Sequence, residues 1–156
     1  LPGDKVRFIK GKLFINESML IREELSDFVE KKIEQGSMKT VPQCVNEPVP
    51  FGNENCIKHQ SLEKLDNGKS YRILDLGQNI GDDTQDFIIG DDEYFFLGDN
   101  RDNSLDSRFD RQFGGVGLVS KEYLIGKASL ILFSSRGSSI FYFWTWRKDR
   151  FFKVIR

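Results

Sequence analysis

A dense run of polar residues follows an apolar stretch late in the chain, and it constrains the fold more than any other feature. Residues 98–108 hold three aspartates, two arginines, two asparagines and two serines, directly after the apolar residues 94–97. A solvated loop needs no aromatic strand leading into it. So much polarity at a strand end indicates a structured network in which each charge has an opposite partner. Such networks gather at active sites more often than on plain scaffolds.

Most of the remaining chain favours β-structure. Apolar runs at residues 6–9 and 13–15 flank Lys10-Gly11, and Asn67-Gly68 separates two further strand-like runs. Such pairs between apolar runs are typical of hairpins. Residues 93–97 are predicted to form the central strand. Aromatic residues make up 13% of the chain, which fits a β-rich core.

One segment departs from this pattern. Between residues 23 and 35, apolar residues recur at spacings of three and four, which indicates an amphipathic helix that begins at Ser26 and ends at Gly36. Residues 38–67 are rich in proline, glycine and asparagine and are typical of a loop excursion.

The chain has two cysteines, Cys44 and Cys56. Two are too few for a disulfide framework. In an oxidising compartment they would pair, whereas in a reducing one they would remain free thiols, and the sequence leaves both alternatives open.

Charge and composition exclude several kinds of partner. Charged residues make up 30% of the chain but leave a formal charge of −1, so no nucleic-acid partner is expected. No apolar run approaches the roughly 20 residues that span a bilayer. The single histidine, His59, has no acidic or cysteine cluster around it in the sequence. A calcium loop that starts at Asp99 would place Arg101 at a ligand position. The sequence therefore predicts neither a metal nor a cofactor.

Residues 98–108 resemble the Gly-Asp-Asn-Arg-Asp-Asn-Ser-x-Asp-Ser-Arg box of type I signal peptidases, also called leader peptidases. These are membrane-anchored serine endopeptidases that remove signal peptides from exported proteins. All ten specified positions match. Residues 1–6 resemble the end of a second family box, in which a Lys-Arg pair precedes a Gly-Leu-Pro-Gly-Asp turn. Residues 117–119 and 124–128 resemble the family's Gly-Phe-Val-Pro and Leu-(Val/Ile)-Gly-(Arg/Lys)-Ala segments.

The resemblance implies a mainly β fold with the coiled antiparallel sheet of the signal peptidase core. Residues 1–22 and 71–156 would form this core, incomplete at its N-terminus. Residues 23–70 would form an inserted, loop-rich subdomain that contains the short helix.

The resemblance also assigns the chemistry. Signal peptidases use a serine nucleophile and a lysine general base, and the base must be neutral, so burial has to lower its pKa. In the family both residues precede the Leu-Pro-Gly-Asp turn, which is residues 1–4 here. The chain is therefore expected to be a C-terminal fragment that lacks the Ser/Lys dyad and is inactive alone.

The box residues have supporting roles in this interpretation. Ser104 corresponds to the serine that bonds and orients the lysine. Asp106 is expected to pair with Arg108, and Asp99 to reach the arginine beside the catalytic lysine. Together with Arg101, these charged residues would form the network that fixes the loop.

The expected substrates are signal peptides of exported preproteins, cut after small residues on the outer face of the cytoplasmic membrane. The aromatic segment at residues 140–146 is either part of the core or a contact with the membrane surface, where tryptophan and tyrosine are enriched. Two alternatives stay open. One is a peptide-binding module that pairs with extended strands, and the other is a related peptidase that processes a transfer pilus.

Overall fold

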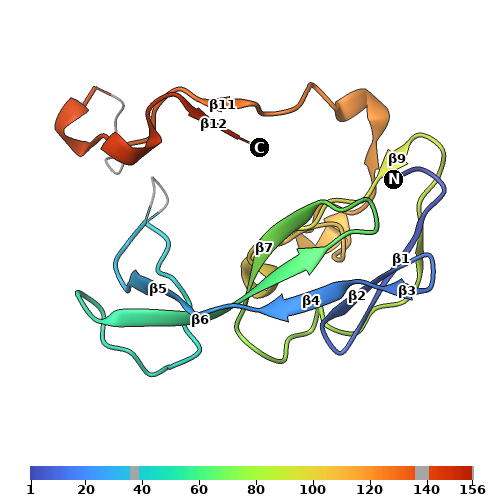
Figure 1. Cartoon of the computed structure of the whole chain (residues 1–156), viewed down its shortest axis with the longest axis horizontal. Coiled ribbons are helices and arrows are strands. Elements are labelled where there is room, and N and C mark those ends of the chain that lie inside the picture. Colours follow the sequence, from blue (N-terminus) through green and yellow to red (C-terminus); the bar gives the residue numbers. More distant parts are fainter. Residues whose placement is uncertain (36–38, 136–140, 156) are drawn as a thin grey trace.

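A computed structural model describes residues 1–35, 39–135 and 141–155, and these residues form a mainly β protein of antiparallel strands and single 3₁₀ turns (Figure 1). The strands are β1 (Lys5–Ile9), β2 (Lys12–Ile15), β3 (Ser18–Met19), β4 (Ile21–Glu24), β5 (Phe28–Lys31), β6 (Asn55–Lys64), β7 (Ser70–Asp75), β8 (Phe87–Ile88), β9 (Glu93–Tyr94), β10 (Val119–Ser120), β11 (Leu130–Ile131) and β12 (Lys153–Val154). The 3₁₀ turns are η1 (Arg101–Asn103), η2 (Arg111–Phe113), η3 (Lys121–Tyr123), η4 (Phe143–Thr145) and η5 (Lys148–Arg150).

The first sheet has the strand order β3-β2-β1-β8. Its β1–β2 hairpin turns at Lys10 and Gly11, whose φ angles of 49° and 72° are those of a tight hairpin turn. This confirms the hairpin predicted there. Alternate side chains of the sheet point inward and form the core, which consists of Val6, Phe8, Leu13, Leu20 and Ile89.

The second sheet is organised around the ten-residue strand β6, the longest in Figure 1. Strand β7 pairs with residues 59–64 of β6. The other edge of β6 is shared, because β5 pairs with residues 55–58 and β4 with residues 61–64. The β6–β7 hairpin turns at Gly68, as the Asn-Gly pair predicts.

The predicted helix at residues 23–35 is wrong. The segment contains the end of β4 and all of β5, and both strands pair with β6. The edge of so long a strand offers backbone hydrogen bonds to both β4 and β5, and this outweighs a local helical pattern. The predicted cap Ser26 lies between the two strands, and Gly36 lies outside the described residues.

The prediction of a central strand at residues 93–97 is also wrong. Only Glu93 and Tyr94 form a strand, and it pairs with β10 alone. The backbone of Phe96 instead bonds to Ser107 of the polar run, through the Ser107 hydroxyl at 2.9 Å and the Ser107 N–H at 3.0 Å. The polar run thus takes the place that a neighbouring strand would occupy.

Two further observations bear on the predicted organisation. Cys44 and Cys56 are joined by a disulfide bond, which decides between the two alternatives left open. The domain boundaries at residues 23 and 70 stay a prediction. The pairing of β6 with β4 and β7 runs across both boundaries.

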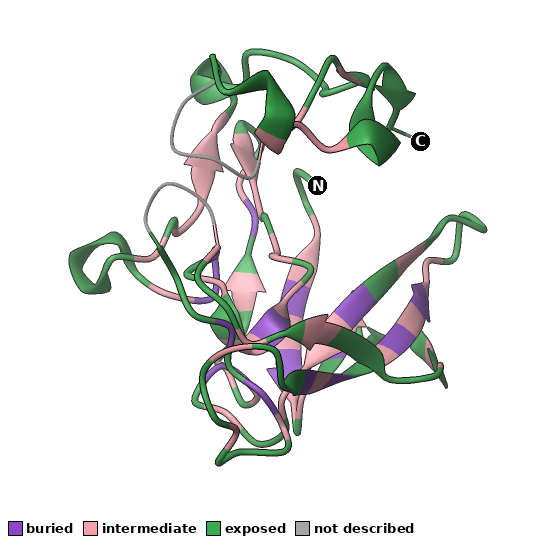
Figure 2. Ribbon diagram, turned by 90° about the vertical axis from the view of Figure 1, so that its left-hand side faces the viewer, coloured by how far each residue is buried: buried purple, intermediate pink, exposed green. Residues whose placement is uncertain are grey.

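The C-terminal part differs from the sheets in its burial. Figure 2 shows an arm of mostly exposed residues, whereas the buried residues lie in the sheets and in the loops against them. No described residue after Arg108 is buried. We call the described residues from the start of β11 onward the arm. It contains the paired strands β11 and β12 and the turns η4 and η5.

Candidate active site

The polar run folds into a corner held by a buried ion pair. Arg108 donates from Nε to Asp106 Oδ1 at 2.9 Å and from Nη2 to Asp106 Oδ2 at 3.0 Å. The Gly98 N–H also donates to Asp106 Oδ2, at 3.0 Å. The expected Asp106–Arg108 ion pair is therefore present, and it ties the two ends of residues 98–108 together.

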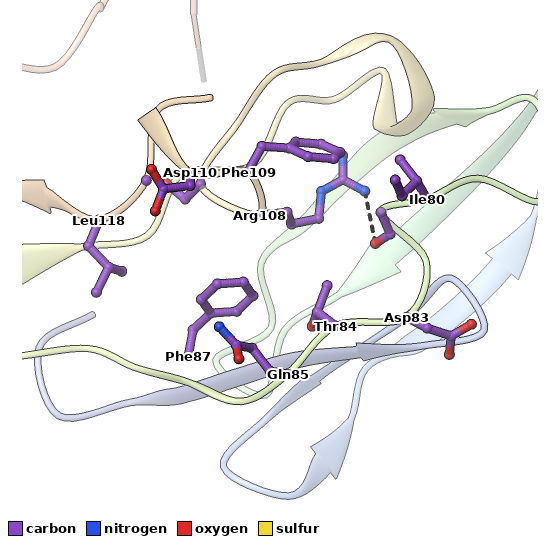
Figure 3. Close-up of a pocket in the computed structure, with 12 residues that line it drawn as sticks. Ile80, Asp83, Thr84, Gln85, Phe87, Arg108, Phe109, Asp110 and Leu118 are labelled. Carbon is purple, nitrogen blue, oxygen red and sulfur yellow. Dashed lines mark hydrogen bonds between the residues drawn. The ribbon is translucent and has the colours of Figure 1, made fainter. Parts of the chain in front are cut away.

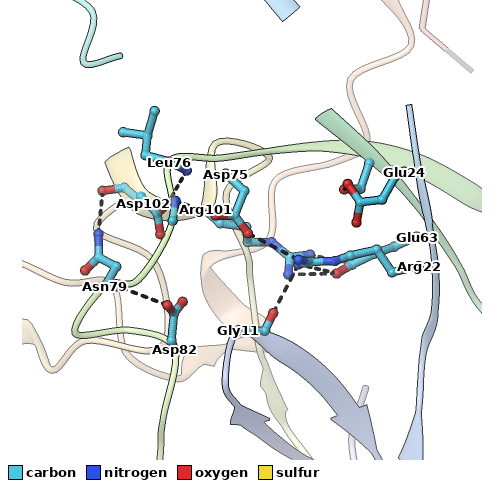
Figure 4. A network of polar contacts seen from close by, with 12 residues as sticks. Gly11, Arg22, Glu24, Glu63, Asp75, Leu76, Asn79, Asp82, Arg101 and Asp102 are labelled. Carbon is cyan, nitrogen blue, oxygen red and sulfur yellow. Dashed lines mark hydrogen bonds and ion pairs between the residues drawn. The ribbon is translucent and has the colours of Figure 1, made fainter. Parts of the chain in front are cut away.

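Arg101 finds its partner outside the run. Its guanidinium donates through both terminal nitrogens to the Glu63 carboxylate of β6, at 3.1 and 2.5 Å. Both side chains are almost fully buried. Arg22 of β4 reaches the same carboxylate at 3.3 Å and also contacts Asp75 at 3.2 Å. Figure 4 shows the two guanidinium groups meeting at Glu63.

An aromatic ring packs against two of these charges. The fully buried Phe8 ring lies 5.5 Å from the Arg101 guanidinium carbon and 5.2 Å from that of Arg108. Phe109 faces Arg108 at 5.5 Å. Guanidinium groups stack well on aromatic faces. The hydrophobic core thus supports the polar corner directly.

Backbone contacts attach the corner to the end of β7. The Leu74 N–H donates to the Asp99 carbonyl at 2.7 Å, and the Leu76 N–H donates to Asp102 Oδ2 at 2.5 Å. Burial raises the pKa of Asp102, and the charges of Asp75 and Asp82 add to this, while the Leu76 N–H opposes it. The loop therefore depends on the β6–β7 hairpin through both side chains and backbone.

Ser104 follows the turn η1 and is half-buried. Its hydroxyl donates to the Asn100 carbonyl at 2.7 Å. It also lies against Gly98, where an added Cβ would come within 1.9 Å of Ser104 Oγ. Only glycine at position 98 therefore leaves room for this hydroxyl.

The residue before this corner lines an apolar cavity. Leu97 and Leu1 both border a cavity of about 210 Å³, together with Tyr71 and Ile89. The turn at residues 1–4 and Leu97, the residue that directly precedes the corner, thus border the same cavity. The Gly3 N–H bonds to the Ile89 carbonyl at 2.9 Å and holds the turn there.

Asp99 behaves differently from the other charged residues of the run. It is exposed, and its carboxylate accepts the neighbouring Asn100 N–H at 2.9 Å. It forms no ion pair with any described residue. A role for Asp99 in an ion-pair network stays a prediction.

A second cavity, of about 440 Å³, is lined in part by Arg108 (Figure 3). Phe87 and Leu118 supply apolar wall, and Arg108 reaches across to the Gly81 carbonyl at 3.5 Å. The residues that the structure describes contain no group of three metal-binding side chains, here or elsewhere. The lining holds one cation, Arg108, and two carboxylates, Asp83 and Asp110, among polar and apolar groups.

The aromatic segment at residues 140–146 was open to two interpretations. Phe141, Phe143 and Trp144 are 82%, 68% and 68% exposed, so the core interpretation is wrong for them. Trp146 is half-buried and stacks on Phe133 at 4.9 Å, and Ile140 lies outside the described residues. Within the described ranges, no helix has the length and apolarity that crossing a membrane requires.

Sequence reasoning missed several residues of the network, among them Phe8, Arg22, Glu63 and Asp75. The signal for Glu63 was available, because it falls in register with the buried Ser61 on an alternating strand. An acidic side chain at an inward position needs a cationic partner. The identity of that partner, 38 residues further on, leaves no trace in local sequence.

Comparisons with known proteins agree with this geometry. Residues 1–133 match the family model described as signal peptidase, peptidase S26. The chain is 34% identical over 143 residues to a protein of Rickettsia bellii named signal peptidase I, and 31% identical over 144 residues to its namesake in Rickettsia typhi. Each match covers 87% of this chain but only 40% and 44% of the relatives, so the chain spans about two fifths of their length. On these matches, the chain belongs to the signal peptidase family, peptidase S26.

Proposed function

We propose that this chain forms part of the catalytic domain of a type I signal peptidase, a serine endopeptidase. The whole enzyme would hydrolyse the bond after small residues at the end of a signal peptide, with a Ser/Lys dyad, at the outer face of the cytoplasmic membrane. The observation that carries the proposal is the placement of Ser104. Its hydroxyl lies against Gly98, and the preceding residue, Leu97, borders the cavity that Leu1 also borders.

The hydrogen bonding of Ser104 defines what it can do for a lysine. A hydroxyl has one donor and two acceptor lone pairs. The donor is engaged with the Asn100 carbonyl, so Ser104 Oγ is left to accept. A neutral lysine amine would then give Ser104 one N–H and keep its lone pair free. That lone pair is what takes the proton of a serine nucleophile.

The proposal assigns neither nucleophile nor base to these 156 residues. In the family motif both residues precede the Leu-Pro-Gly-Asp turn, which corresponds to residues 1–4. The purified chain is therefore expected to leave a preprotein uncut. Ser104 is a positioning residue in this scheme.

A chimera tests the proposal. The part of the Rickettsia typhi relative that precedes its matching segment is joined to this chain, and cleavage of a preprotein is followed by mass spectrometry. We expect cleavage at the end of the signal peptide, and a fall in kcat of about 100-fold in Ser104→Ala, since misplacing a catalytic group has effects of this size. Ser120→Ala is the matched control, because the Ser120 side chain caps nothing in η3. Equal kcat for the two variants would contradict the role of Ser104.

The same assay separates the alternative functions. β8 pairs only with β1 among the described strands, and an extended peptide can pair with an edge strand of this kind. A module that only binds peptides would retain the preprotein on the chimera without cutting it. A pilus-processing peptidase would cut a pilin precursor in preference to a preprotein, and the relatives named signal peptidase I favour the preprotein.

A further inference from the structure

We propose that Glu63, on the β6–β7 hairpin, is a positioning residue for Ser104 and acts through Arg101. The inference rests on the proposed function and adds to it a residue outside the polar run. It starts from a buried carboxylate that the dyad chemistry does not itself require. The Glu63 side chain is 1% exposed and lies on β6, which among the described strands pairs with β4, β5 and β7 and with none of the first sheet.

The register of the second sheet determines which side chains surround the Glu63 carboxylate that Arg101 binds. In the antiparallel ladders, Arg22 of β4 and Tyr71 of β7 both lie directly opposite Glu63. Opposed residues project from the same face of a sheet, so these three side chains form one row. The Arg101 guanidinium approaches this row and engages both oxygens of Glu63. A two-point contact of this kind fixes orientation as well as distance.

The position of Arg101 is coupled to that of Ser104 through a single 3₁₀ turn of the backbone. Arg101 begins η1, and Ser104 directly follows it. The Ser104 hydroxyl bonds to the carbonyl of Asn100, the residue that precedes Arg101. Any displacement of Arg101 therefore moves both the backbone that carries Ser104 and the acceptor that holds its hydroxyl.

Loss of the Glu63 charge acts on this turn selectively. Arg22 keeps Asp75 as a partner, and Arg108 keeps Asp106. Arg101 has no second carboxylate among its contacts in the described residues. A buried guanidinium without a counter-charge moves toward water. We therefore expect η1 to leave its position in Glu63→Gln while the rest of the network remains.

Hydrogen exchange of the 156-residue chain measures this directly. The Leu74 and Leu76 amides report on the loop, since their acceptors are Asp99 and Asp102. In Glu63→Gln both amides are expected to exchange about tenfold faster or more, while the Leu20 amide of the first sheet is unchanged. Glu23→Gln, which removes an exposed ion pair between β4 and Lys64 of β6, next to Glu63 in sequence but on the opposite face of the sheet, is the matched control. Unchanged exchange at Leu74 and Leu76 would overturn the inference.

A neutral pair covers the case in which the single variant fails to fold. Glu63→Gln combined with Arg101→Gln leaves no unpaired buried charge at this place. It is expected to fold and still to show fast exchange at Leu74 and Leu76. Native exchange rates in the double variant would mean that the pair does not hold the loop, and would also overturn the inference.

Kinetics of the chimera connect the loop to chemistry. Glu63→Gln is expected to lower kcat by about 10- to 100-fold with KM within about twofold, because a group is misplaced and substrate contacts are retained. A purely structural role would change the amount of folded enzyme and leave kcat per folded molecule intact. If the unmodified chimera cuts nothing, the proposed function fails, whereas the exchange result on the chain alone still decides the role of Glu63.

Discussion

Charges buried at the polar corner compensate one another side chain by side chain. Arg22, Arg101 and Arg108 face Glu63, Asp75 and Asp106, so three cations meet three anions. A buried charge without a partner costs several kcal/mol, and a compensated set avoids that cost. Stacking of Phe8 against two of the guanidinium groups adds a contact that lysine in their place would make less well. The corner therefore depends on the planar guanidinium group of arginine, which pairs with carboxylates and stacks on an aromatic ring.

Tyr71 offers a measurement of this environment. Burial raises the pKa of Tyr71 to about 12, and the Glu63 carboxylate adds to the shift while Arg101 opposes it. In the unfolded chain a tyrosine ionises near pH 10. The folded state thus keeps its proton where the unfolded state loses it. The contribution of Tyr71 is complete below pH 10 and is lost as the pH rises toward 12.

Spectrophotometric titration of the phenol groups checks this prediction. We expect a component that ionises near pH 12, absent in Tyr71→Phe. The free energy of unfolding of the unmodified chain should fall more steeply between pH 10 and pH 12 than that of Tyr71→Phe. Identical pH dependence for the two proteins would contradict the assignment.

A comparison of the predicted and observed strands and turns shows which parts of the fold can be predicted from the sequence. The hairpins at Lys10-Gly11 and Asn67-Gly68 were predicted correctly because each turn contains a glycine, which adopts the positive φ of the turn without steric cost. The local pattern of residues 28–31 predicts a helix, but the segment forms β5 because it pairs with the long edge of β6, which is remote in sequence. The Asp106–Arg108 pair was found through a family motif, while Glu63 was not, since no motif joins β6 to the polar run. Local sequence thus predicts turns, but it does not predict which segments pair when they are distant in sequence.

The far end of β6 depends on the disulfide bond. Cys56 lies near the start of β6, and Cys44 lies in the loop that packs over it, 12 residues earlier in sequence. Closing a loop of this length removes conformational freedom from the unfolded chain. Replacing both cysteines by serine is therefore expected to lower the free energy of unfolding by about 3 kcal/mol.

Urea unfolding with and without a reductant measures this contribution. Reduction should destabilise the unmodified chain and leave the Cys44→Ser/Cys56→Ser variant unaffected. Exchange at the Leu74 amide should stay slow relative to global unfolding in the variant, since Glu63 lies at the other end of β6. A reductant effect of the same size in both proteins would contradict the prediction.

On the scale of the whole molecule, the chain has two parts that differ in burial and in surface chemistry, and the boundary between them is Arg108. Up to Arg108 the side chains build the sheets and the polar corner, and beyond it no described residue is buried (Figure 2). Residues 141–156 of the arm nonetheless include aromatic side chains that stack on one another, and they contain five basic residues and one acidic residue. An exposed aromatic and basic surface suits the interface of an anionic membrane. This is the expected attachment of the proposed enzyme to its membrane, besides any anchor.

The arm is therefore expected to serve membrane binding and not folding. Phe143 and Trp144 contact each other and Tyr142, all within the arm, so replacing Phe143 and Trp144 by alanine should change the free energy of unfolding by less than about 0.5 kcal/mol. Inserting two such side chains into an interface is worth several kcal/mol, so binding to anionic phospholipid vesicles should weaken by about 100-fold.

A matched double variant, Ile80→Ala with Phe113→Ala, removes side chains that are 83% and 75% exposed elsewhere on the molecule and should leave vesicle binding unchanged. Vesicle co-sedimentation and urea unfolding of the three proteins measure both quantities. Equal vesicle binding by all three would show that the arm does not contact the membrane, and a large loss of stability in the arm variant would show that it belongs to the folded core.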